Sequence, residues 1–80
     1  MHLLVDYKTS DVAAFRSDFD ADSEKRMQAG LTLLQMWQEA DSAGTVVCLF
    51  DVNDRAKAET WLTTETRTGA QASGRFLKTV

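Results

Sequence analysis

Cysteine, histidine and proline are nearly absent from this chain of 80 residues, which has one cysteine, one histidine and no proline. With Cys48 alone, no internal disulfide can form, and His2 adds too few nitrogen and sulfur ligands for a structural zinc site. A domain this short buries only about 60–65% of the surface that its unfolded chain exposes. Because small domains usually need a disulfide, a metal or a partner for stability, we expect a partner subunit and no metal.

Clustered positive charge is also missing. The net charge is −3, and Lys25 and Arg26 are the only adjacent basic residues, in a segment rich in acids. A nucleic-acid surface needs clustered Lys and Arg to displace counterions, so we expect no nucleic-acid partner. We interpret this charged segment as a solvated helix face.

Long hydrophobic runs are absent too. The apolar run at the N-terminus ends at Asp6 and has no basic region before it, which argues against a targeting signal. A membrane helix needs about 20 apolar residues, and no stretch approaches that length. We therefore expect no membrane association and a reducing, cytoplasmic setting.

What the sequence does contain is alternating strand and helix periodicity. Residues 2–8 are apolar and partly β-branched, which predicts a strand. Ser10 is the expected N-cap of a helix, with Asp11 favourably placed on the helix dipole. Helical spacing then continues to Gly30, a good helix-terminating residue. The apolar positions that open this helix are Val12, Phe15 and Phe19.

The second half of the chain is predicted to hold two strands, a second helix and a last strand. Residues 31–38 and 45–52 are two strands that a turn at 40–44 joins into a hairpin. Asn53 is the expected cap of a second helix, and residues 65–72 are expected to add a further helical turn or two. The last strand is expected over 75–80. The apolar positions of the second helix are Ala58, Trp61 and Leu62.

This order predicts one α+β domain over residues 1–80. Helices that cross between the strands of a short chain give an antiparallel four-stranded sheet with the helices on one face. We therefore expect the ferredoxin-like βαββαβ arrangement, with the first and third strands in the middle of the sheet.

Each predicted strand divides into two sets, because side chains alternate across a strand. One set is apolar throughout and is expected to face the helices. The opposite set has an apolar centre that no helix can cover, so we expect a homodimer in which two sheets pack face to face about a two-fold axis. The helix-facing set is Leu3, Val5, Tyr7, Val46, Cys48, Phe50, Val52 and Phe76; the interface candidates are Leu4, Val47, Leu49 and Leu77, with either Leu34 and Met36 or Leu33 and Trp37.

Two segments carry a family resemblance. Residues 14–31 and 46–62 resemble the first helix and the later strand and helix of small dimeric α/β-barrel proteins, the antibiotic-biosynthesis-monooxygenase-like proteins and their relatives. The resemblance implies a cavity between helices and sheet and a barrel-like dimer. At Asp22 the chain departs from the family's pattern, in which many members carry a histidine. The positions that match the pattern are Phe15, Phe19, Arg26 and Gly30.

Asp22 and Arg26 are the strongest candidates for a site. They lie four residues apart on the helix face that begins with apolar residues, and such local conflicts are typical of functional sites. One interpretation places them, with Ser23, at the mouth of the cavity, where Arg26 binds an anionic or phenolate-like ligand. The other is an i,i+4 ion pair worth a few tenths of a kcal/mol.

The aromatic residues Tyr7, Trp37 and Trp61 are candidates for the wall of a pocket that takes a flat apolar ligand, although ordinary core packing is the favoured interpretation, especially for Trp61 beside Leu62. We interpret Cys48 as a small buried hydrophobe. Alternation places His2 on the opposite face, which argues against a Cys–His nucleophilic pair. The candidate ligand-binding residues are Tyr7, Phe19, Asp22, Arg26, Phe50 and Trp61.

The leading functional hypothesis is a small-molecule-binding protein of the dimeric α/β-barrel type that needs no cofactor. A second is a cofactor-independent monooxygenase or isomerase of a phenolic or quinol-like substrate, in which Arg26 or Tyr7 stabilises developing charge. A third is a structural or assembly module with a solid core.

Overall fold

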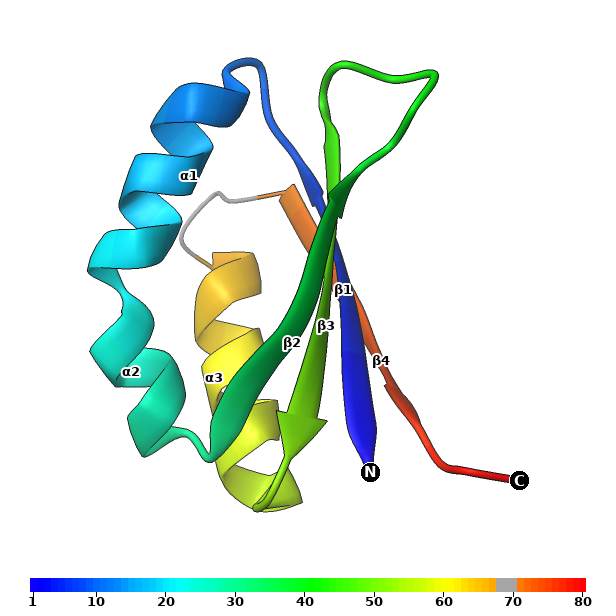
Figure 1. Cartoon of the computed structure of the whole chain (residues 1–80). Coiled ribbons are helices and arrows are strands. Elements are labelled where there is room, and N and C mark those ends of the chain that lie inside the picture. The colour runs from blue at the N-terminus through cyan, green and yellow to red at the C-terminus, as the bar shows by residue number, and fades with distance from the viewer. Residues whose placement is uncertain (68–70) are drawn as a thin grey trace.

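The computed structural model describes residues 1–67 and 71–80 of the chain (Figure 1). Its strands and helices follow the predicted order, with one additional helix. In chain order they are β1 (His2–Lys8), α1 (Val12–Ala21), α2 (Ser23–Gln28), β2 (Leu31–Gln38), β3 (Thr45–Val52), α3 (Arg55–Arg67) and β4 (Gln71–Leu77).

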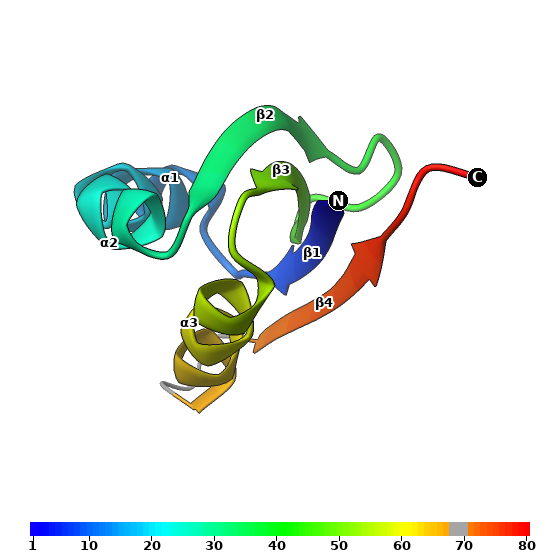
Figure 2. The same cartoon turned by 90° about the horizontal axis from the view of Figure 1, so that it is seen from below.

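The strands form one four-stranded sheet in the order β2-β3-β1-β4. Every neighbouring pair is antiparallel, and β1 and β3 lie in the middle, as predicted. The helices lie together on one side of this curved sheet (Figure 2). The architecture is α+β and is compatible with the ferredoxin-like fold.

The core lies between the helices and the sheet. The apolar set predicted to face the helices does so, and all of it is buried except the half-buried Phe76. Helix residues from both halves of the chain close this layer, including Phe19 and Trp61. Full burial of one such side chain is worth about 1.5–3 kcal/mol, so this layer is the main source of stability. Fully buried side chains at its centre are Leu3, Val5, Cys48 and Phe50.

In β2 neither of the two residue pairs that were predicted to share the open face of the sheet is right. Its register against β3 shifts between Leu33 and Gln35. Beyond the shift, Met36 lies opposite Cys48 and packs against the core, while Trp37 lies opposite Val47 on the other face. One extra residue in a strand inverts the alternation that follows it, and periodicity alone does not reveal the insertion.

The single helix predicted from Ser10 to Gly30 is wrong in two respects. The N-cap is Asp11, whose side chain accepts a hydrogen bond from the Ala14 N–H at 3.0 Å. The helix is also interrupted at Asp22, which separates α1 from α2. In a continuous helix the Phe19 carbonyl would accept from the backbone four residues later. Here it accepts instead from the Asp22 N–H at 3.2 Å and from Arg26 Nη1 at 2.6 Å.

Helix α3 begins one residue later than predicted. Asp54, not Asn53, caps it, because its Oδ1 accepts from the Lys57 N–H at 3.1 Å. The helix continues through Thr63 and Thr64, whose hydroxyls donate to the carbonyls four residues earlier at 2.9 and 3.1 Å. Within the described residues, no helix is long and apolar enough to cross a membrane.

Strand β4 corrects the prediction for the end of the chain. It begins at Gln71 rather than Arg75 and ends at Leu77 rather than Val80. The part of the expected helical segment 65–72 that falls on 68–70 lies outside the described residues. Gly74 lies inside this strand, and α3 packs closely against it: a Cβ at this position would lie 2.9 Å from the Leu62 methyl groups.

Gly30 ends the first helical region in the left-handed conformation, with φ of 74°. A Cβ there would lie 3.2 Å from both Asn53 Oδ1 and the Asp54 backbone nitrogen. The turn into β2 therefore packs closely against the start of α3. A hydrogen bond joins the two, because the Asn53 N–H donates to the Gly30 carbonyl at 2.9 Å.

We expect Gly30→Ala to lower the free energy of unfolding by at least about 1–2 kcal/mol, the cost of the left-handed conformation for a residue with a Cβ. Urea denaturation followed by circular dichroism measures this change. Ser17→Ala, on the exposed side of α1, is the control and should have little effect. Equal stability of Gly30→Ala and the wild type would contradict the backbone geometry of this turn.

Candidate functional site

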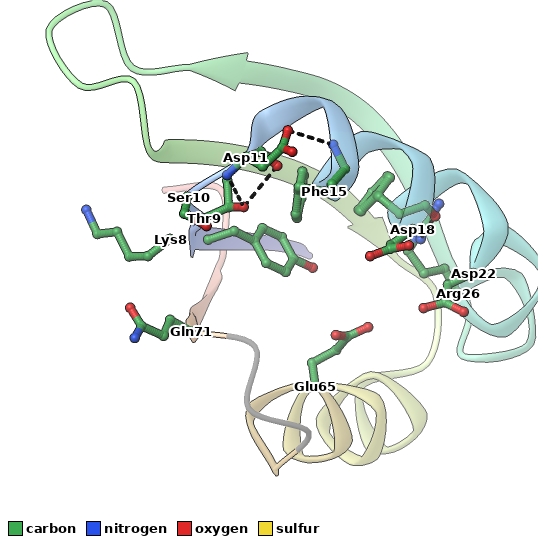
Figure 3. Close-up of a pocket in the computed structure, with 13 residues that line it drawn as sticks. Lys8, Thr9, Ser10, Asp11, Phe15, Asp18, Asp22, Arg26, Glu65 and Gln71 are labelled. Atoms are coloured by element: carbon green, nitrogen blue, oxygen red, sulfur yellow. Dashed lines mark hydrogen bonds between the residues drawn. The ribbon is translucent and has the colours of Figure 1, made fainter.

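A pocket of about 380 Å³ opens where α1, α3 and the adjoining ends of β1 and β4 meet (Figure 3). Its volume lies at the lower end of the range for small-molecule sites. The described residues that line it are Tyr7, Lys8, Thr9, Ser10, Asp11, Ala14, Phe15, Asp18, Phe19, Asp22, Arg26, Glu65 and Gln71.

Three aromatic rings form the apolar wall of the pocket. The Tyr7 centroid lies 4.9 Å from that of Phe15 and 6.3 Å from that of Phe19, and the Phe15 and Phe19 centroids are 5.7 Å apart. Helical spacing brings Phe15 and Phe19 to one face of α1, while strand alternation turns Tyr7 towards them. Such a wall suits a flat apolar group.

The aromatic contacts continue behind this wall into the core. Phe50 stacks with Phe19 at a centroid distance of 6.3 Å, and Trp61 meets Phe50 edge-on at 5.7 Å. Of the predicted ligand-binding residues, Phe50 and Trp61 thus lie behind the pocket wall rather than in it. Trp37 lies on the opposite face of the sheet.

Arg26 lines the inner end of the pocket and is almost completely buried, with 7% of its surface exposed. Its guanidinium carbon lies 3.5 Å from the centroid of the Phe19 ring, and its Nη1 donates to the Phe19 carbonyl. Desolvation lowers the pKa of Arg26, while the neighbouring Asp22 charge opposes that shift. The guanidinium therefore already contacts a residue of the pocket wall, Phe19, through its ring and its carbonyl.

Asp22 also lines the pocket, so the structure brings it together with Arg26. Its carboxylate forms an ion pair with Lys25 Nζ, at 3.9 Å. Ser23, the third residue predicted at the mouth, is exposed and is not among the described residues that line the pocket.

Glu65 is a pocket residue that the sequence interpretation missed. It projects from α3 towards the side of the pocket that carries Asp18 and Asp22 (Figure 3). Burial raises the pKa of Glu65, and the charge of Asp22 raises it further. Its position four residues after Trp61 was an available signal, because that spacing places both on the buried face of a helix.

The polar residues at the outer end of the pocket are engaged with their own neighbours. Lys8 Nζ donates to Thr45 Oγ1 at 2.8 Å, and Asp11 caps α1. The Thr9 hydroxyl accepts from the Asp11 N–H at 3.2 Å. These groups shape the mouth of the pocket.

Tyr7 presents an unusual polar group. Only 4% of its surface is exposed, and its hydroxyl is buried without a hydrogen-bond partner among the described residues. Burial raises the pKa of Tyr7 well above its usual value, and the charge of Glu65 raises it further, so the hydroxyl stays neutral. A buried polar group with no partner costs about 1–3 kcal/mol, and in a native protein its presence needs an explanation.

Cys48 is completely buried in the sheet, and burial raises the pKa of its thiol to about 12. His2 lies opposite Asp51 on the other face of the sheet, so the two residues do not form a nucleophilic pair. Across residues 1–67 and 71–80, no group of three or more His, Cys, Asp or Glu is placed to hold a metal ion.

We expect Tyr7→Phe to raise the free energy of unfolding by about 1 kcal/mol, because it removes a buried hydroxyl that lacks a partner and keeps the ring contacts. Urea denaturation of both proteins measures the difference. Tyr7→Leu, which also removes the ring contacts with Phe15 and Phe19, should destabilise the protein. A marked loss of stability in Tyr7→Phe would show that the hydroxyl is already satisfied.

Comparisons with protein-family models, with curated proteins and with solved structures gave no match for this chain. The geometry and chemistry of the pocket are therefore the basis for assigning it a function.

Proposed function

We propose that this protein binds a small molecule in the pocket between its helices and its sheet. The observation that carries the proposal is the wall formed by Tyr7, Phe15 and Phe19, beside which ionisable groups converge. Binding sites typically combine such an apolar lining with a few polar groups that fix orientation. One planar ring against this wall is the core of the expected ligand.

The resemblance to dimeric α/β-barrel proteins supports the same location. It implies a ligand cavity between helices and sheet, and the pocket lies in that layer. Tyr7, Phe19, Asp22 and Arg26, which the sequence singled out as candidates, line it. Phe50 and Trp61 support the wall from behind through their contacts with Phe19 and with each other.

A set of single-ring aromatic compounds, titrated into the protein and followed by the shifts of its backbone amide resonances, tests this proposal. We expect shifts at Phe15 and Phe19. Ala14→Trp places a large side chain at the pocket lining and should weaken binding by about tenfold or more. Ala13→Trp is the matched control, because Ala13 is exposed on the same helix and is not a lining residue.

Failure of every compound to bind would refute a pocket for aromatic ligands. Equal binding by Ala14→Trp and Ala13→Trp would place the ligand elsewhere on the protein.

We propose as well that the protein forms a homodimer through the sheet face opposite the helices. On this face Leu4 lies opposite Leu49, and Val47 lies between Asp6 and Trp37. Trp37 is 47% exposed. An apolar cluster of this kind on a small domain favours association. Leu77, which pairs with His2 and is 37% exposed, lies at its edge.

The charges on this face favour a second copy of the same chain as the partner. Arg75 lies opposite Leu4, and Asp6 lies opposite Ser73 on the neighbouring row. A surface that carries both signs beside an apolar centre can be complementary to itself across a two-fold axis.

Sedimentation velocity at micromolar concentration tests the dimer. We expect the wild type to sediment as a dimer and Leu49→Asp to sediment as a folded monomer, because a carboxylate at the centre of the interface would be desolvated without a partner. Ala13→Asp, on the exposed side of α1, is the control for the added charge and should remain dimeric. A monomeric wild type would remove the proposal.

A further inference from the structure

Among the described residues that line the pocket, most of the charged ones are acidic. Asp11, Asp18, Asp22 and Glu65 outnumber Lys8 and Arg26 in this set. Lys8 and Asp11 are engaged at the outer end, in the Thr45 contact and the helix cap. Around the inner part, the described lining residues Asp18, Asp22 and Glu65 accompany Arg26, and Asp22 also pairs with Lys25 Nζ at 3.9 Å.

That guanidinium is poorly placed to bind an anion. The Arg26 guanidinium lies over the Phe19 ring and donates to the Phe19 carbonyl. An anionic ligand that reached it would also approach Asp22 and Glu65, whose charges act on Arg26 already. Repulsion from two carboxylates in a partly desolvated site opposes anion binding.

The carboxylates of Asp22 and Glu65 approach the pocket from different elements (Figure 3). Asp22 stands at the break between α1 and α2, and Glu65 stands on α3. Their mutual repulsion and the burial of Glu65 disfavour its ionised form, as its raised pKa shows. A positive charge between them would relieve both effects.

The Tyr7 hydroxyl points to a ligand at the same place. It is buried, has no hydrogen-bond partner among the described residues, and lies close enough to Glu65, Arg26 and Asp22 to experience their charges. Since it stays neutral, its oxygen can accept a hydrogen bond from a ligand N–H.

We propose that the ligand is an arylalkylamine in its protonated form, whose ring packs on Phe15 and Phe19 while its ammonium group lies among Asp22, Glu65 and the Tyr7 hydroxyl. This rests on the proposed function and names the class of ligand. Aromatic rings beside carboxylates are a favourable environment for an organic cation, through cation–π attraction and charge-assisted hydrogen bonds.

Three probes of nearly equal size separate the alternatives: phenethylamine, phenethyl alcohol and phenylacetate. Titrations at pH 7, followed by backbone amide shifts, give the affinity of each. We expect phenethylamine to bind about tenfold more tightly than phenethyl alcohol, and phenylacetate to bind most weakly.

Glu65→Gln should weaken the binding of phenethylamine by about fivefold and leave that of phenethyl alcohol unchanged. Glu59→Gln is the matched control, because it removes the same charge from the exposed side of the same helix. Tyr7→Phe, which keeps the ring, should also weaken the binding of phenethylamine selectively.

Equal affinity for the amine and the alcohol would overturn the cation proposal while leaving the pocket intact. Tightest binding of phenylacetate would overturn it in favour of an anion on Arg26. If none of the three probes binds while other single-ring aromatic compounds do, this inference fails and the proposed function stands; if no aromatic compound binds, both fail.

Discussion

The contact between Arg26 and Phe19 determines the form of the helical layer. The guanidinium donates to the Phe19 carbonyl just before the helical segment is interrupted at Asp22. The same guanidinium lies over the Phe19 ring, whose other ring contacts include Phe50. A single side chain thus connects the break in the helical segment with the pocket wall.

The pocket concentrates features that oppose stability. A tyrosine hydroxyl is buried without a partner among the described residues, an arginine is buried, and Glu65 is partly desolvated beside another carboxylate. In a domain of 80 residues the margin of stability is small. Such costs are typical of sites where binding, rather than folding, determines which residues are present.

Local periodicity predicted the strands and the helix-facing core, and the order of strands and helices along the chain predicted the strand order of the sheet. The errors arose where a distant contact overrides the local pattern. The break at Asp22 accompanies the bond from Arg26 back to α1, and the glycine inside β4 is required because α3 leaves no room for a side chain at position 74. Tyr7 and Asp22 were predicted as site residues from their positions, whereas Glu65 was missed because it was assigned to a further helical turn over 65–72 and not to the helix that carries Trp61.

The register shift in β2 has a practical consequence for observing the molecule. Because it turns Trp37 to the open face while Trp61 stays with α3 in the core, the two tryptophans of the chain report on opposite sides of the sheet. Trp37 lies in a half-exposed environment on the face proposed to meet a second copy, and Trp61 lies in a buried one behind the pocket wall. Intrinsic fluorescence therefore carries two signals, one from the open face of the sheet and the other from the packing behind the pocket.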